Sequence, residues 1–128
     1  MRIDGQDFRT IWPSADGDGV QVIDQTLLPH RFEVATLRTV EQAAAAISDM
    51  TVRGAPLIGV TAAFGVALAM GADASDGSLE HAGKLLTAAR PTAVNLRWAV
   101  ERMRARLAVL PSAERAAAAQ AEALRVAD

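Results

Sequence analysis

Two arginines stand where the chain turns sharply and a helix is expected to begin. Arg53 precedes a Gly-Ala-Pro turn, and Arg90 precedes Pro91. Proline suits the first turn of a helix because it has no N–H and a fixed φ. That first turn offers unpaired N–H groups and the positive end of the helix dipole, which favour anions. An adjacent arginine can add a bidentate contact to a phosphate, so the sequence predicts one anion site built from two helix starts.

The same two arginines also have a purely structural interpretation. Most surface arginines are solvated or satisfy carboxylates and loop carbonyls, and the residue types alone do not decide between the two roles. Asn95 lies one turn into the helix expected after Arg90 and is a second-rank candidate, for contact with a ligand hydroxyl. An asparagine in a first helical turn often bonds only the local backbone.

Metal and cofactor chemistry is not predicted. His30 and His81 are far apart in sequence and lack partners at ligand spacing, so structural roles are favoured for both. Asp16 and Asp18 resemble part of a calcium loop, but no glutamate closes it and a turn is the better interpretation. The chain has no cysteine, which excludes a disulfide or a thiolate nucleophile within it.

Composition points to one globular domain without a nucleic-acid or membrane-surface partner. The chain has 128 residues, 51% of them hydrophobic, and its formal net charge of -2 gives no field that attracts anionic polymers. The N-terminus lacks the apolar core of a signal peptide, so a cytoplasmic location is expected. Four of the five aromatic residues are too scattered for a base-stacking platform and are expected in the core: Trp12, Phe32, Phe64 and Trp98.

The element pattern predicts an α+β domain over residues 1–128. Within 8–38, "FRTIW", "VQVID" and "FEVATLR" favour a small antiparallel sheet of three strands. From Thr39 the apolar period becomes helical, which predicts a bundle of about five helices over 39–128. The predicted helices begin at Thr39 with a capping box, at Pro56, near Leu79, near Thr92 and after Pro111. The arginines of the fourth helix are expected on a solvated face.

The segment between Arg53 and Asp73 contains no charge. Its length would allow a membrane span. However, it is rich in glycine and alanine, has Pro56 near its start, and lacks an aromatic belt or a basic cluster. A central helix buried by its neighbours is therefore favoured, with Gly59 and Gly65 among the small residues that allow close approach.

Three stretches together resemble one family: "VIDQTLLP" at 22–29, "VRGAPLIGVTAAFGVALA" at 52–69 and "RPTAVNLRWA" at 90–99. They are similar to the N-terminal domain of the methylthioribose-1-phosphate isomerases. That superfamily also holds ribose-1,5-bisphosphate isomerase and the regulatory subunits of translation initiation factor 2B. The resemblance covers most of the chain in order and spacing.

The resemblance implies a small sheet joined to a helical bundle and a role in methionine salvage. It implies that Arg53, Gly54, Ala55 and Arg90 contact the sugar phosphate. Family members continue into a Rossmann-like domain that supplies a catalytic cysteine and aspartate, which would lie beyond Asp128. This chain lacks that domain and is expected to be inactive alone, to need no cofactor, and to form a homodimer in the full-length protein.

Three functions follow as hypotheses from this resemblance. The first is the substrate-binding part of an aldose-ketose isomerase that converts 5-methylthioribose 1-phosphate to 5-methylthioribulose 1-phosphate. The second is a non-catalytic protein, like the initiation factor 2B regulatory subunits, that binds a sugar phosphate or nucleotide and assembles with other subunits. The third is ribose-1,5-bisphosphate isomerase, which differs in substrate.

Overall fold

The computed structural model describes residues 2–3, 6–7, 11–14, 19–24, 33–52 and 54–127. Strands β3 (Ile11–Pro13), β4 (Val20–Ile23) and β5 (Val34–Leu37) form an antiparallel sheet in the order β3-β4-β5, as predicted. Two short strands that were not predicted, β1 (Arg2–Ile3) and β2 (Gln6–Asp7), pair with each other.

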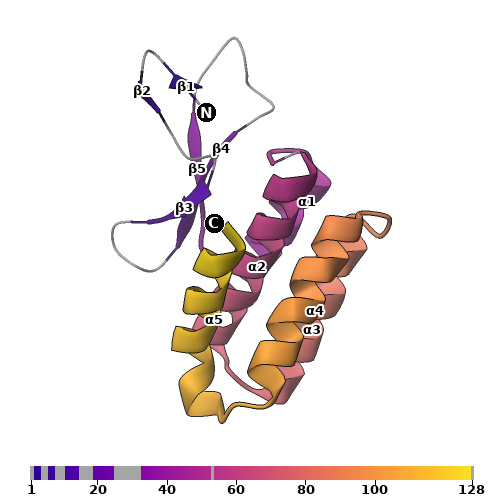
Figure 1. Cartoon of the computed structure of the whole chain (residues 1–128). Coiled ribbons are helices and arrows are strands. Elements are labelled where there is room, and N and C mark those ends of the chain that lie inside the picture. Colours follow the sequence, from indigo (N-terminus) through magenta and orange to yellow (C-terminus); the bar gives the residue numbers. More distant parts are fainter. Residues whose placement is uncertain are drawn as a thin grey trace.

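Five helices follow the sheet: α1 (Val40–Ser48), α2 (Ala55–Ala72), α3 (Asp76–Ala89), α4 (Val94–Ala108) and α5 (Ser112–Ala127). They form a bundle with the sheet at one end (Figure 1). The predicted α+β class, with a three-stranded sheet and five helices, is confirmed.

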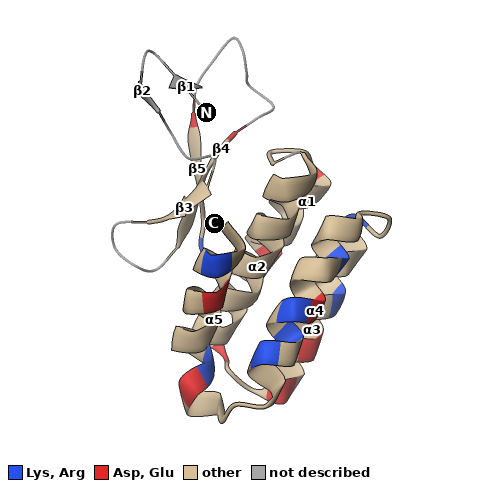
Figure 2. Cartoon of the chain, viewed as in Figure 1, with Lys and Arg blue, Asp and Glu red and all other residues tan. Residues whose placement is uncertain are grey.

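Helix α2 is the centre of the bundle and packs against each of the other four helices. It is long and apolar enough to cross a membrane, but 67% of that segment is buried inside the protein. It carries no charged residue, whereas each of the other four helices does (Figure 2). The charge-free segment is therefore the buried central helix that the sequence favoured.

Close approach to α2 depends on its glycines. A Cβ on Gly59 would lie 3.1 Å from the backbone oxygen of Asn95 in α4. One on Gly65 would lie 3.0 Å from the Leu86 side chain of α3 and 3.1 Å from that of Ala43 in α1. The absence of side chains at these two positions lets α4 approach through its backbone, and α1 and α3 through their side chains.

Two helix starts differ from the predicted ones. Helix α3 begins at Asp76 rather than near Leu79, because the hydroxyl of Ser75 accepts a hydrogen bond from the Ser78 N–H and caps a first turn without large apolar residues. Helix α4 begins at Val94 rather than near Thr92, because the Ala93 N–H closes a turn onto the Arg90 carbonyl. Apolar periodicity cannot detect either arrangement.

Candidate functional site

The N-termini of α2 and α4 lie at the same end of the bundle as the C-terminus of α5 (Figure 1). Between them is a hollow of about 540 Å³, which we call the N-terminal hollow. It is lined by Pro56, Gly59, Val60, Val94, Asn95, Trp98, Val126 and Ala127. Segments far apart in the sequence thus supply its walls, and the two helix starts predicted to share an anion site border one cavity.

These two helix starts differ from those of α1 and α3. Thr39 caps α1 and Ser75 caps α3 through side-chain hydroxyls, whereas no side chain caps α2 or α4. The first turns of α1, α3 and α5 contain Glu41, Asp76 and Glu114, but those of α2 and α4 contain no acidic residue. The positive ends of α2 and α4 therefore have no carboxylate from their own first turns, which suits them to an external anion.

The structure describes three of the four predicted substrate contacts. Arg53 lies outside the described residues. Gly54 is the N-cap of α2 and has a φ of 96°, a left-handed conformation that favours glycine. Ala55 is the first residue of α2 and is exposed. Arg90 ends α3 in the link to α4, half-buried, and its side chain forms no ion pair with any described residue.

Asn95 lies in the first turn of α4, is exposed and lines the hollow. The second-rank candidate is thus beside the two helix starts.

Trp98 was predicted in the core, and that prediction is wrong. Its side chain is 55% exposed and forms part of the hollow's wall, while Phe64 is buried and Trp12 is half-buried with its Nε1–H donating to Gln21 Oε1 at 2.8 Å. Phe32 lies outside the described residues. The sequence did contain a signal for Trp98: it follows Asn95 by three positions, which places both on one side of a helix.

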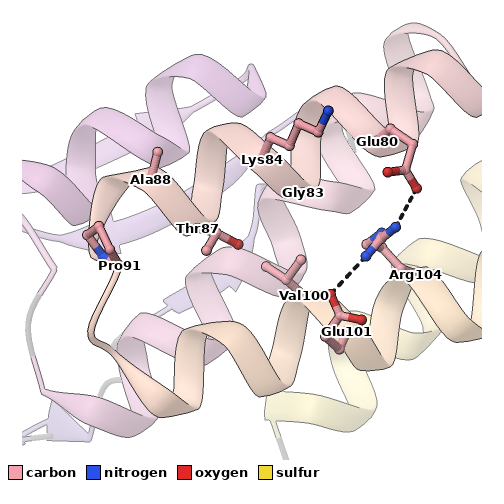
Figure 3. A pocket seen from close by; sticks show the side chains of 9 residues that line it. All are labelled: Glu80, Gly83, Lys84, Thr87, Ala88, Pro91, Val100, Glu101 and Arg104. Atoms are coloured by element: carbon pink, nitrogen blue, oxygen red, sulfur yellow. Dashed lines mark hydrogen bonds and ion pairs between the residues drawn. The ribbon is translucent and has the colours of Figure 1, made fainter.

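The predicted solvated face of α4 also needs correction, because two of its arginines are paired and only partly exposed. Arg104 reaches between Glu80 and Glu101 beside a second hollow of about 380 Å³ between α3 and α4 (Figure 3). These carboxylates raise the pKa of Arg104 and offset its charge. This second hollow is consequently a weaker candidate for an anion than the N-terminal hollow.

The described residues contain no group of histidine and acidic side chains that could hold a metal ion. His81 Nε2 lies 3.9 Å from Glu41 Oε2, and both side chains are about two-thirds exposed. His30, Asp16 and Asp18 lie outside the described part of the chain.

Related proteins have similar sequences over most or all of this chain. The methylthioribose-1-phosphate isomerase of Methylocella silvestris is 58% identical over 96% of the chain, and that of Methylorubrum extorquens is 57% identical over all of it. The chain spans only about a third of the length of these relatives, 34% and 35%.

Two solved structures have the same fold. The 5-methylthioribose 1-phosphate isomerase from Pyrococcus horikoshii matches with a TM-score of 0.83 and 38% identity, over 92% of this chain and 35% of its own. The translation initiation factor eIF-2B subunit delta from A. fulgidus matches with a TM-score of 0.83 and 36% identity, over 94% of this chain and 36% of its own.

The family model matched by the chain spans residues 51–128 and is described as the initiation factor 2 subunit family. The match includes α2 to α5 and hence every segment that lines the N-terminal hollow. Since it covers more than half of the sequence, this chain belongs to the initiation factor 2 subunit family.

Proposed function

We propose that this chain is the sugar-phosphate-binding part of an aldose-ketose isomerase that acts on methylthioribose 1-phosphate. The observation that carries the proposal is the meeting of two helix N-termini, without side-chain caps or first-turn carboxylates, at one hollow. The names of the relatives, at 53–58% identity, supply the substrate class and the reaction.

In this proposal Arg53, Gly54, Ala55 and Arg90 bind the phosphate and the sugar. N–H groups at the starts of α2 and α4 would donate to phosphate oxygens, and the two arginines would add charge-assisted hydrogen bonds. Gly54 would let the backbone approach the ligand closely. Asn95 would orient a sugar hydroxyl from the first turn of α4.

The chemistry of such a substrate explains why binding geometry is a large part of the task. A phosphate on the anomeric carbon keeps the sugar ring from opening as a free hemiacetal does, so hydrogen transfer between C1 and C2 needs a shaped site that excludes water. This chain can supply phosphate positioning and one wall. The acid and base groups for the transfer would come from the part of the protein that the relatives have in addition.

The test is a chimera in which this chain replaces the matching third of the Methylocella silvestris isomerase. Arg53→Ala and Arg90→Ala should each weaken substrate capture, measured as kcat/KM for methylthioribose 1-phosphate, by about 1.5–3 kcal/mol. Arg106→Ala is the control, because Arg106 is exposed in the last turn of α4, away from the hollow. Unchanged turnover in both variants would show that the site assignment is wrong.

A non-catalytic binding protein is the second candidate, because the initiation factor subunit matches the fold as well as the isomerase does. Two measurements on the chimera separate the possibilities. Calorimetric titration with methylthioribose 1-phosphate and with ribose 1,5-bisphosphate measures binding, and the kinetic assay with the same two compounds measures turnover. Binding without turnover favours the second candidate, and turnover of the bisphosphate alone favours ribose-1,5-bisphosphate isomerase.

We further propose that the complete protein is a cytoplasmic homodimer. Cell fractionation and light scattering of the full-length protein test these two properties, and a membrane-bound or monomeric protein would contradict them.

A further inference from the structure

Trp98 is a large aromatic side chain held at a largely exposed position. It lies on α4, lines the N-terminal hollow and is 55% exposed. The guanidinium carbon of Arg102, one turn further along α4, lies 5.3 Å from the centre of the indole ring. This distance is within the range of a cation–π interaction, which restrains the ring.

Arg102 is itself anchored to α5. Its Nε–H donates a hydrogen bond of 2.6 Å to Oε2 of Glu122, whose residue is only 7% exposed. The second oxygen of that carboxylate accepts a bond of 2.7 Å from Nη1 of Arg125. Both oxygens of Glu122 are thus engaged, and a buried carboxylate held this way fixes the geometry of its partners more firmly than an exposed ion pair does.

Glu122 also lies one helical turn before Val126, which lines the hollow from α5. The carboxylate therefore connects both walls: Trp98 through Arg102, and the last turn of α5 through its own backbone. Arg104, two positions after Arg102, binds Glu80 and Glu101 on the other side of α4 and takes no part in this connection (Figure 3).

We propose that Glu122 is a positioning residue: together with Arg102 it fixes the indole of Trp98 and the last turn of α5, and so sets the spacing of the two walls of the N-terminal hollow. The relation of this spacing to substrate rests on the proposed function, whereas the restraint on Trp98 is independent of it.

The first test follows Trp98 directly in a Trp12→Phe background, where it is the single tryptophan. Glu122→Gln and Arg102→Met should lower the fluorescence anisotropy of Trp98 in the folded protein and raise its acrylamide quenching constant by about twofold. Arg102→Lys, which keeps a cation beside the ring, should restore part of the parent's anisotropy.

Glu101→Gln is the matched control, because it removes a carboxylate that binds Arg104 beside the second hollow, between α3 and α4. It should leave both Trp98 signals unchanged. A role in stability alone would shift the unfolding midpoint without altering the signals of the folded state. If Trp98 is as restrained in folded Glu122→Gln and Arg102→Met as in the parent, the proposal is wrong.

The second test measures binding of methylthioribose 1-phosphate to the same variants by calorimetric titration. A several-fold weaker affinity in Glu122→Gln and Arg102→Met, with Glu101→Gln unaffected, supports the role in the hollow. An equal affinity despite a mobile Trp98 overturns that role. A parent that does not bind the compound counts against the proposed function, and the fluorescence result still decides the restraint on Trp98.

Discussion

At the scale of single residues, Arg115 is the least expected side chain in the protein. It is only 5% exposed and joins three segments. Its Nε–H donates to the Leu107 carbonyl at 3.0 Å, one Nη donates to the Ala74 carbonyl at 2.9 Å, and the other pairs with Asp76 at 2.6 Å. The guanidinium therefore satisfies the end of α4 and the loop before α3.

Replacing Arg115 with methionine should destabilise the fold strongly. The substitution keeps most of the side-chain length but removes the donor to the Ala74 carbonyl, one of the donors to the Leu107 carbonyl and the partner of Asp76. We therefore expect a loss of about 3 kcal/mol in the free energy of unfolding. Urea denaturation measures this value. Arg97→Met is the control, because Arg97 is exposed and pairs with no described residue; an equal loss in the control would contradict the role of Arg115.

Glu122 should make the stability of the protein sensitive to acid. The hydrogen bond from Arg102, followed by that from Arg125, holds the pKa of Glu122 below its ordinary value of 4.5. A lowered pKa in the folded state stabilises the fold above the unfolded-state pKa, and this contribution is lost as the pH falls from about 4.5 through the folded-state pKa.

The measurement is urea denaturation at about pH 7 and about pH 3.5, where part of the Glu122 contribution should be gone. The pH-dependent loss should be smaller in Glu122→Gln, since glutamine does not titrate. Asp73 contributes in the same direction, because the Ser75 N–H lowers its pKa, so Asp73→Asn serves as a comparison. An identical loss in the parent and Glu122→Gln would rule out this contribution.

At the scale of elements, the close contact between α2 and α4 shapes the hollow. Gly59 lies against the backbone of Asn95, so α2 and the first turn of α4 are nearer to each other there than a side chain would allow. The same contact brings the uncapped N-termini to one cavity. Helix packing and the candidate anion site therefore depend on the same glycine.

Gly59→Ala should destabilise the protein although alanine favours helices. The new Cβ would lie 3.1 Å from the Asn95 oxygen, and pushing α4 away should cost about 1–3 kcal/mol. Gly71→Ala in the same helix meets nothing within 4 Å and should instead stabilise by about 0.5–1 kcal/mol. Thermal denaturation of both variants checks the opposite signs; equal signs would contradict the packing account.

At the scale of the whole molecule, the sheet and the bundle share one hydrophobic core. Ile11, Val20 and Val22 of the sheet belong to the same buried cluster as Ile47, Phe64 and Leu96 of the helices. We propose on this basis that residues 1–128 unfold as a single cooperative domain. Each of the two tryptophans reports on one part, Trp12 in β3 and Trp98 in α4.

Single-tryptophan variants test this cooperativity. Trp98→Phe leaves Trp12 to report on the sheet, and Trp12→Phe leaves Trp98 to report on the bundle. In each variant the fluorescence transition in urea should coincide with the helical circular-dichroism transition. A Trp12 transition at lower urea than the helical one would show that the sheet unfolds separately.

Helix caps and helix starts could be predicted from the sequence because they depend on a few neighbouring residues. The Thr39 hydroxyl caps α1 by accepting a hydrogen bond from the Gln42 N–H at 3.1 Å, as predicted, and Pro56 lies in the first turn of α2, which begins one residue before the predicted start. The missing charge between Arg53 and Asp73, together with the glycine and alanine content and the missing aromatic belt, favoured a buried central helix over a membrane span, and most of α2 is buried.

Only the tertiary structure decided which helix faces meet. Trp98 lies on the side of α4 opposite its apolar stripe, so its hydrophobicity alone predicted burial wrongly. Arg115 and Glu122 lie on the same face of α5 as the buried Ala119 and Ala123. Because alanines occur all around this helix, apolar periodicity did not identify that face as the buried one. Periodicity fixes the faces of one helix, whereas burial depends on neighbours brought by chain segments distant in sequence. That is how α2, α4 and α5 come to enclose one hollow.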